Sequence, residues 1–345
     1  MICGESAGGS SASSRGAPAR QDFDQATAGD PTRPRSRIPR RELDGVLLLD
    51  KDIGLSSNAA LQRARRLYRA EKAGHTGTLD PLASGLLPIC FGEATKFAHM
   101  LLEGDKTYAA TVRLGLTTTT GDAEGDPVEE RPVHVSRGDI EAALARFVGA
   151  IAQVPPRHAA LKYRGRNYYQ YAREGIDIPR VAREVVIHEL ALDAWCFPDV
   201  QLTVRCGKGT YVRVLAEDLG TTLGCGGHLT ALRRIASGGF DVGASLSLEA
   251  LEALDEAARD ARLLPVDALL STLPRLDLDD ADAWRLGRGQ LIARCDLPDG
   301  DYRAYAAGRF VGVGRASEGG LRPRRLLATG DAGGASRALV ESLES

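Results

Sequence analysis

The sequence predicts an α+β fold, because stretches with strand periodicity and stretches with helical periodicity are interspersed along the chain. Residues 107–114 alternate between apolar and polar side chains, as in a half-buried strand. Two more alternating stretches, 184–195 and 199–206, lie between helical patterns at 137–148 and 211–223. A mixture of this kind is typical of a sheet covered by helices.

Length and composition indicate a globular protein without a membrane span. The 345 residues suffice for two domains, and hydrophobic residues make up 43% of them. No apolar stretch reaches the roughly 18 residues that cross a bilayer. The six cysteines form no CxxC pair, so neither a zinc site nor a disulfide framework is indicated. The formal net charge of −2 argues against a uniformly basic protein but allows a local basic surface.

The two ends of the chain differ in composition from its middle. Residues 1–43 are rich in Gly, Ser, Ala, Pro and Arg and predict a disordered tail, and residues 333–345 are expected to form a second, C-terminal tail. The tail lacks the apolar core of a secretory signal, and its acidic residues argue against a transit peptide. Its basic run Arg33–Arg41 could contact RNA or be a solvated linker. We expect two ordered domains, at 44–265 and at 270–332.

Order is expected to begin at residues 45–49, an apolar run typical of a buried strand, with a tight turn at 50–54. A helix follows, capped by Ser56, Ser57 or Asn58. Its apolar side comprises Leu61, Ala64 and Tyr68. Arginines on its other sides predict a basic helical surface.

Later elements follow from similar patterns. Ser136 and Asp139 form a capping box in front of the helix at 137–148. A Leu-, Ala- and acid-rich stretch at 246–262 predicts one helix, and the Gly-punctuated stretch 286–327 predicts a small β-rich module.

The most informative segment is Gly74–Pro88, a loop-like stretch dense in glycine and proline that contains one acid, Asp80. An isolated Asp-Pro pair usually caps a turn, and that interpretation stays open. The segment nevertheless resembles the catalytic motif of TruB-type tRNA pseudouridine-55 synthases. Their signature Gly-His-Thr-Gly-x-Leu-Asp-Pro-x-Ala-x-Gly is matched here at every fixed position.

The resemblance extends, in the order of the family, from Gly45 to about Thr329. The matching segments are Gly45–Lys51, Lys106–Tyr108, Gly121–Gly125, Gln153–Pro156, Gly207–Arg213, Leu223–Leu229, Leu232–Arg234 and Leu321–Leu327. Asp52 replaces a common proline, and Arg157 and Ala159 also depart from the usual pattern. The resemblance implies a pseudouridine synthase catalytic domain, built on a mixed, mainly antiparallel sheet with flanking helices, and a small β-rich PUA-like C-terminal domain.

The resemblance also implies the reaction, in which a tRNA uridine at position 55 of the T loop becomes pseudouridine. The N1 glycosidic bond must break, the base must rotate, and C5 must attack the anomeric carbon, which requires neither a cofactor nor a metal. Asp80 is the expected nucleophile, attacking C6 or C1′. By resemblance Arg213 pairs with Asp80, although it could be a surface arginine. The expected partner is the tRNA T arm, for a cytoplasmic monomer without a guide RNA.

Other candidate site residues come from the same resemblance. Tyr108 is the expected active-site tyrosine, stacking on the extruded base and relaying a proton, although strand alternation alone favours a core tyrosine. Tyr211 and Leu232 are expected around the flipped base, or else in the core. Three more candidates for substrate binding are His75, Lys51 and Asp122. His75 could instead be a structural turn histidine.

A basic, tyrosine-rich stretch, residues 157–173, is the expected RNA-binding face, or else a solvated loop over packed tyrosines. Its side chains are Arg157, Lys162, Arg164, Arg166 and Arg173 with Tyr163, Tyr168, Tyr169 and Tyr171. Two rival functions remain. Asp50-Lys51-Asp52 after an apolar strand is similar to a magnesium-dependent phosphatase motif, and a basic surface would also suit a non-enzymatic tRNA chaperone.

Overall fold

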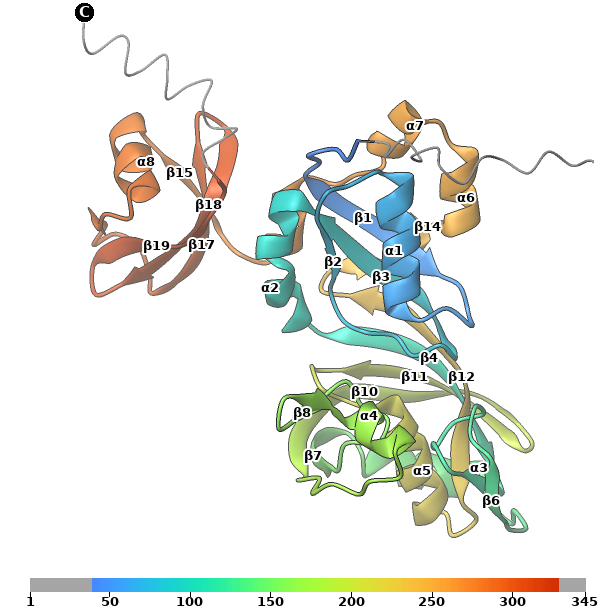
Figure 1. Ribbon diagram of the computed structural model, residues 1–345. Helices are drawn as coiled ribbons and strands as arrows, with labels where there is room; N and C mark the ends of the chain where they lie inside the picture. The colour runs from blue at the N-terminus through green and yellow to red at the C-terminus, as the bar shows by residue number, and fades with distance from the viewer. Residues whose placement is uncertain (1–38, 329–345) are drawn as a thin grey trace, which may run out of the picture. The chain divides into compact units, whose positions relative to one another are not determined.

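The computed structural model describes residues 39–328, and its main feature is a large mixed sheet (Figure 1). The order along the sheet is β14-β1-β3-β12-β4-β11-β10-β7, with β2 paired to β3 and β13 paired to β12. These strands are β1 (Gly45–Lys51), β2 (Ala73–His75), β3 (Ala83–Phe91), β4 (Lys106–Leu114), β7 (Gly149–Gln153), β10 (Arg183–Cys196), β11 (Asp199–Cys206), β12 (Gly227–Ser237), β13 (Phe240–Asp241) and β14 (Leu246–Ser247). The strands predicted at 45–49, 107–114, 184–195 and 199–206 are confirmed.

Most neighbours in this sheet are antiparallel, as predicted. Only β1 with β14 and β3 with β12 run parallel. The β3–β12 pair requires glycine at position 85, because Gly85 has a φ of +99° and an added Cβ would overlap the backbone of Arg234. The α+β class with a mixed, mainly antiparallel sheet is therefore confirmed.

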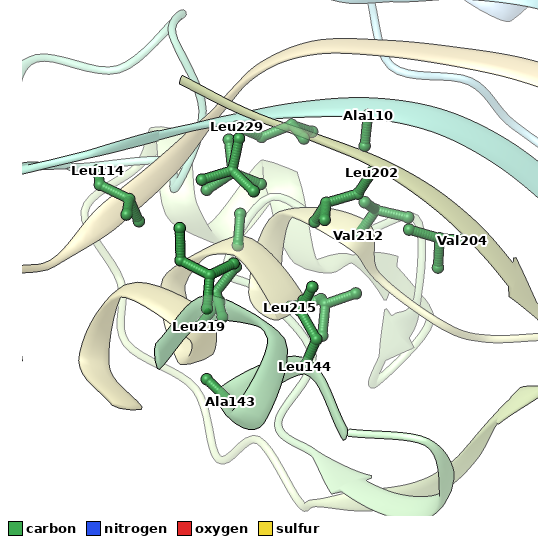
Figure 2. Close-up of a cluster of buried hydrophobic side chains, with 14 of the residues drawn as sticks. Ala110, Leu114, Ala143, Leu144, Leu202, Val204, Val212, Leu215, Leu219 and Leu229 are labelled. Carbon is green, nitrogen blue, oxygen red and sulfur yellow. The ribbon is translucent and has the colours of Figure 1, made fainter. Parts of the chain in front are cut away.

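One core lies between the sheet and helices α3 (Arg137–Ala145) and α5 (Val212–Thr222). Figure 2 shows Leu144, Leu215 and Leu219 of these helices facing the strand residues Leu202 and Leu229. The capping box of Ser136 and Asp139 is present. The predicted helix 137–148 is three residues too long, because the chain must turn to enter β7 at Gly149, whose φ is +102°.

A second core is covered by helices α1 (Ser57–Leu67) and α6 (Leu248–Ala253) and includes apolar residues of β1 and β3. Ser56 is the N-cap of α1 and accepts a hydrogen bond from the Ala59 amide. Ser57, a second predicted cap, is buried and bonds to Leu79 instead. The sequence therefore predicted the helix correctly but left three candidates for its N-cap. Because Ser57 bonds to Leu79 in the adjacent loop, Ser56 serves as the cap.

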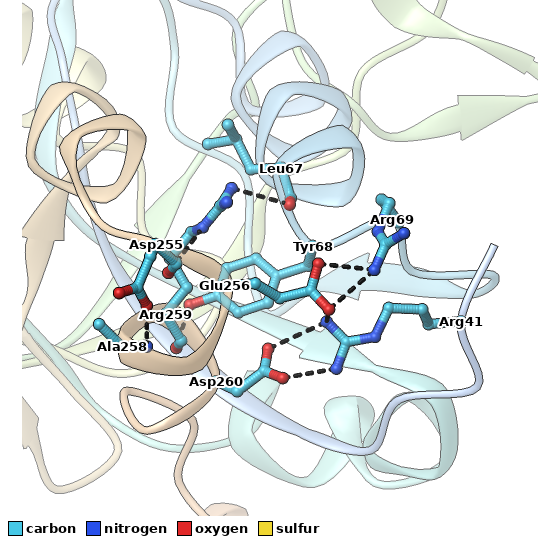
Figure 3. A network of polar contacts seen from close by, with 9 residues as sticks. All are labelled: Arg41, Leu67, Tyr68, Arg69, Asp255, Glu256, Ala258, Arg259 and Asp260. Atoms are coloured by element: carbon cyan, nitrogen blue, oxygen red, sulfur yellow. Dashed lines mark hydrogen bonds and ion pairs between the residues drawn. The ribbon is translucent and has the colours of Figure 1, made fainter. Parts of the chain in front are cut away.

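Helix α1 is joined to the chain's first described residues and to a distant helix, α7 (Glu256–Asp260), by a polar network (Figure 3). Arg41 pairs with Asp260 and Glu256, and Arg69 also pairs with Glu256. The Tyr68 hydroxyl donates to the Arg259 carbonyl at 2.9 Å. Arg41 thus makes contacts that the tail prediction for 1–43 did not include. Residues 1–38 and 329–345 lie outside the described residues, so the tails remain predictions.

The helical prediction for 246–262 is confirmed for residues 248–253 and 256–260, but the segment is not one continuous helix. The segment forms the short strand β14 and two helices, α6 and α7. The break occurs because Ser247 and Asp255 each cap a new helix, accepting hydrogen bonds from Ala250 and Ala258 amides.

The C-terminal part forms its own sheet, in the order β15-β17-β18-β19-β16. Its elements are β15 (Arg275–Leu278), α8 (Asp280–Gly287), β16 (Ile292–Ala293), β17 (Gly300–Ala306), β18 (Arg309–Ser317) and β19 (Gly320–Leu326). The predicted small β-rich domain is confirmed, and the domain limits 44–265 and 270–332 stay predictions.

The remaining elements are short. They are 3-10 helices η1 (Gly92–Lys96), η2 (Val242–Ala244) and η3 (Val266–Leu270), helices α2 (Ala98–Leu102) and α4 (Tyr168–Arg173), and two hairpins, β5 (Leu116–Thr118) with β6 (Pro127–Glu130) and β8 (Lys162–Tyr163) with β9 (Arg166–Asn167). No helix within residues 39–328 is long and apolar enough to cross a membrane.

Candidate active site

Asp80 lies in a short connection between two paired strands. The segment Gly74–Pro88 is only partly a loop, because its ends belong to β2 and β3, which pair with each other. Ser57 fixes the connection: its Oγ accepts from the Leu79 amide at 2.7 Å and donates to the Leu79 carbonyl at 2.9 Å. Asp80 is thus presented by a tethered loop rather than a mobile one.

Arg213 forms ion pairs with two carboxylates. Its Nη2 lies 2.9 Å from Asp80 Oδ2, and its Nη1 lies 3.3 Å from Asp122 Oδ2. The same nitrogens donate to the carbonyls of His158 and Thr120 at 3.3 and 3.4 Å. The Arg213 side chain is 7% exposed and that of Asp80 is 39% exposed. The geometry therefore orients a carboxylate that solvent and a ligand can still reach.

Asp122 supports this arrangement from within the protein. Its side chain is 3% exposed, and its Oδ1 accepts from Thr120 Oγ1 at 2.5 Å and from the Glu124 amide at 3.1 Å. Substrate can hardly touch a carboxylate so enclosed. We therefore assign Asp122 a role in holding Arg213, which differs from the predicted substrate contact.

The environment of Asp80 has opposing effects on its charge. Burial raises the pKa of Asp80 above its ordinary value, Arg213 lowers it, and the nearby Asp122 raises it again. Burial also raises the pKa of Glu124, with contributions from Asp122 and Asp80. Arg213 is thus the main cation that opposes proton uptake at a site crowded with carboxylates, with a smaller contribution from Lys51.

Tyr108 and Leu232 lie on adjacent strands, β4 and β12, and both pack against the two cores. Tyr108 is opposite Arg234 in the β4–β12 pair, and Leu232 is opposite Ala83, three residues after Asp80. Burial raises the pKa of Tyr108, which Arg234 opposes. Both predicted residues therefore line the same region as Asp80.

Lys51 is enclosed by the protein, and His75 is partly buried. Lys51 is fully buried, and its Nζ donates to the carbonyls of Asp52 and Leu55 at 2.9 and 2.6 Å. Burial lowers the pKa of Lys51 to about 8. His75 is in β2, its Nδ1 is buried without a hydrogen-bond partner, and burial lowers its pKa. Lys51 thus ties β1 to the following turn.

Tyr211 is the N-cap residue of α5, two positions before Arg213. Its backbone forms a matched pair of hydrogen bonds with the side chain of Gln153: the Tyr211 amide donates to Oε1 at 3.0 Å, and Nε2 donates to the Tyr211 carbonyl at 3.3 Å. The Gln153 side chain therefore fixes the entry of the helix that carries Arg213.

The basic stretch 157–173 forms the β8–β9 hairpin and α4. Arginines lie over tyrosine rings, with Arg164 5.3 Å from the Tyr163 ring centre and Arg166 4.7 Å from that of Tyr171. Tyr163 and Tyr171 also pack edge to face, and Tyr168 is buried. The two interpretations of this stretch are thus compatible: the tyrosines support a surface on which the guanidinium groups are exposed.

The phosphatase motif has no matching geometry. Asp50 is held by Arg233 in an ion pair of 2.7 Å, and Lys51 is buried against carbonyls. In the part of the chain that the structure describes, no group of three or more His, Cys, Asp or Glu side chains could hold a metal ion.

Arg234 was given no role from the sequence, although it lies two residues after Leu232 and so on the same face of the strand.

Comparison with known proteins agrees with this site. Residues 65–212 match the family described as "TruB family pseudouridylate synthase (N terminal domain)". Residues 213–271 match "tRNA pseudouridylate synthase B C-terminal domain", and residues 274–327 match "Pseudouridine synthase II TruB, C-terminal".

Curated relatives cover nearly the same length. The "tRNA pseudouridine synthase B" of Burkholderia mallei is 58% identical over 305 residues, 86% of this chain and 98% of that protein. The protein of the same name from Azoarcus sp. is 54% identical over 293 residues, 85% and 98% of the two chains. Among solved structures, a chain of a "Cbf5-Nop10-Gar1 Complex" is similar with a TM-score of 0.61 and 25% identity, covering 79% of this chain and 78% of that one. The chain therefore belongs to the TruB family of pseudouridine synthases.

Proposed function

We propose that this protein isomerises a tRNA uridine to pseudouridine, at position 55 in the T loop. The observation that carries the proposal is the half-exposed Asp80 carboxylate, ion-paired with the buried Arg213 beside Tyr108 and Leu232. The names of the relatives support tRNA as the substrate. Position 55 rests on the match of Gly74–Gly85 to the family signature.

Each of the site residues has its own role in the reaction. Asp80 is the nucleophile, and its covalent adduct at C6 or C1′ lets the N1 glycosidic bond break while the base stays in the site. Arg213 keeps Asp80 ionised and aimed. The Asp80 adduct then breaks: the carboxylate is displaced from C1′ as C5 attacks the anomeric carbon, or is eliminated from C6 after C5 has bonded. The C5 proton must leave and N1 must gain one, and we propose that Tyr108 relays it. The steps are balanced without an oxidant, a reductant or a metal.

The target base must leave the stack to reach Asp80. Leu232, Tyr108 and Tyr211 supply apolar and aromatic surface that replaces the lost stacking. We propose that His75, on β2 next to the Asp80 loop, contacts the RNA from which the base is extruded.

The T arm would lie on the basic face formed by β8, β9 and α4. The Arg166 side chain is 46% exposed, pairs with Glu174 and lies over the Tyr171 ring. It would exchange Glu174 for a phosphate of the bound RNA. Because Leu82–Gly85 and Leu223–Gly226 resemble the stand-alone bacterial enzymes, we propose that the protein acts without a guide RNA, as a monomer in the cytoplasm.

The test incubates purified protein with unmodified tRNA transcript, without cofactor, metal or added RNA, and maps pseudouridine by carbodiimide treatment and primer extension. We expect conversion at one T-loop uridine by the wild type and none by Asp80→Asn. Asp126→Asn, which alters an exposed carboxylate two residues beyond Glu124, is the matched control and should stay active.

Other outcomes separate the alternatives. If both proteins bind the transcript and neither converts it, the chaperone function replaces the enzymatic one. Conversion by Asp80→Asn would remove Asp80 from the role of nucleophile.

A further inference from the structure

A single buried serine holds the residue next to Asp80. Ser57 is the first residue of α1 and is 2% exposed. Its hydroxyl accepts from the Leu79 amide and donates to the Leu79 carbonyl, at 2.7 and 2.9 Å. Within residues 39–328 no other group bonds to the backbone of Leu79. The peptide groups on both sides of Leu79 therefore depend on one side chain.

The second of these peptide groups ends at the Cα atom of Asp80. Because a peptide group is planar, its carbonyl oxygen, its nitrogen and the following Cα atom move together. The bond from Ser57 to the Leu79 carbonyl thus fixes the point from which the Asp80 side chain starts. Another tether of the loop is more distant, since Arg234 Nη2 donates to the carbonyl of Gly77, three residues before Asp80, at 3.3 Å.

The chain is also held on the other side of Asp80, and from the same connection between β1 and α1. The Gly54 amide donates to the Pro81 carbonyl at 2.8 Å. The Leu79 side chain is buried in the core that α1 covers. The connection that contains Gly54 and ends at Ser57 therefore grips the residues before and after Asp80, and Ser57 supplies the side-chain part of that grip.

We propose that Ser57 is a positioning residue, which holds the Asp80 carboxylate at the place that Arg213 and the target uridine require. This inference rests on the proposed function, because it assigns Ser57 an effect on the rate of conversion. Without the hydroxyl, a buried amide and a buried carbonyl would lose their partners, and the loop would shift to bring them to water. A shift of about 1 Å at a reacting group is enough to slow a reaction strongly.

The neighbouring Ser56 allows loop positioning to be separated from helix stability. Ser56 is exposed and caps α1 by accepting from the Ala59 amide. Replacing Ser57 by alanine leaves this cap in place and puts a good helix former at the first helical position. Replacing Ser56 by alanine removes the cap and leaves both bonds to Leu79. The two variants thus differ in which of the two adjacent hydroxyls is lost.

The first experiment measures single-turnover conversion of tRNA and equilibrium tRNA binding for both variants. Ser57→Ala should slow conversion by about 100-fold. Its tRNA dissociation constant should stay within about twofold of the wild type, because the RNA face is untouched. Ser56→Ala should keep the wild-type rate while its unfolding midpoint falls by about 2–4 °C. A wild-type rate for Ser57→Ala would overturn the proposal.

A pair of variants with the same shape tests whether the hydroxyl itself is responsible. Threonine keeps the hydroxyl, and valine replaces it by a methyl group of similar size. Ser57→Thr should convert tRNA at least about tenfold faster than Ser57→Val, because only threonine can bond to the Leu79 backbone. Equal rates for the two variants would overturn the proposal, since a loss caused by crowding alone affects both.

Amide exchange in the wild type keeps the inference testable if the variants do not fold. The Leu79 amide should exchange at least about 100-fold more slowly than an unbonded amide, because its proton is bonded to a buried oxygen. NMR resolves this amide from its neighbours. Exchange as fast as that of an exposed amide would overturn the proposal. If the wild type makes no pseudouridine, the proposed function fails, whereas exchange at Leu79 still decides whether Ser57 holds the loop.

Discussion

The protein buries two arginines near Asp80 and compensates their charges in opposite ways. Arg213, on α5, bonds to two carboxylates and two carbonyls. Arg234, on β12, bonds to the carbonyls of Leu86 and Gly77, with no carboxylate among its described partners. The ion-paired arginine contacts the nucleophile directly, and the carbonyl-bound arginine lies behind the loop.

The difference indicates that the two arginines have different roles. Charge pairing changes with protonation, so Arg213 couples the site to the ionisation of Asp80. Carbonyl oxygens do not titrate, so the bonds of Arg234 persist at any pH at which the protein is folded. Arg213 is thus suited to controlling the charge of Asp80, and Arg234 to holding the loop that carries Asp80 in place.

The largest expected effect is a loss of activity on replacing Asp80, which distinguishes it from Asp122, the other carboxylate paired with Arg213. Asp80→Asn should slow conversion by at least about 10⁴-fold, because it removes the nucleophile. Its free energy of unfolding should change by less than about 1 kcal/mol, because Asp80 is partly exposed. Single-turnover kinetics and urea unfolding measure both. A large loss of stability would mean that Asp80 has a structural role like that of Asp122.

Asp122→Ala should lower the free energy of unfolding markedly, unlike Asp80→Asn. Breaking a buried ion pair leaves Arg213 with one carboxylate partner, Asp80, and the free energy of unfolding should fall by about 3–5 kcal/mol. Urea unfolding measures it, with the exposed Asp126→Ala as control. A loss as small as that of the control would contradict the supporting role of Asp122.

The pH dependence of catalysis tests the charge coupling. The reactive form of Asp80 is the carboxylate and burial raises its pKa, so the rate should fall as pH drops, with the midpoint above the ordinary carboxylate value. Arg213 lowers the pKa of Asp80, so Arg213→Gln should move this midpoint to higher pH. Single-turnover rates across the pH range of stable protein measure it. An unmoved midpoint would show that Arg213 does not govern the ionisation of Asp80.

The smallest effect is expected at an exposed arginine of the basic face. Arg166→Gln should weaken tRNA binding several-fold and reduce the slope of log affinity against log salt by about 0.7–0.9. The rate at saturating tRNA should not change. Arg137→Gln, on the exposed side of α3, is the control. A salt slope equal to that of the wild type would place the RNA elsewhere.

Much of this site could be predicted from the sequence, for reasons that differ by residue. Alternation in 107–114 indicated which side of the strand carries Tyr108, because strand periodicity is local. The pairing of Asp80 with Arg213 joins distant segments, so only the family resemblance implied it. Arg234 was matched to the family only as part of Leu232–Arg234, and its carbonyl partners, Leu86 and Gly77, lie about 150 residues earlier, so no local pattern could predict its burial among them.

Local signals also competed with one another. Glycine and proline in Gly74–Pro88 predicted a loop, yet β3 continues through Pro88 because apolar residues 86–91 are buried between neighbouring strands. The acid-rich stretch 246–262 predicted one helix, and two caps divided it.

The position of β12 has a consequence for synthesis of the protein on the ribosome. This strand lies between β3 and β4 and joins the two parts of the large sheet, yet it is made after almost all the others. Until residue 237 has emerged, β4 presents an unpaired edge and residues 83–85 of β3 lack their partner strand, and such edges can associate with other chains. The nascent chain thus carries these unpaired edges from the completion of β4 at residue 114 until β12 is made, and β12 then joins the two parts of the sheet.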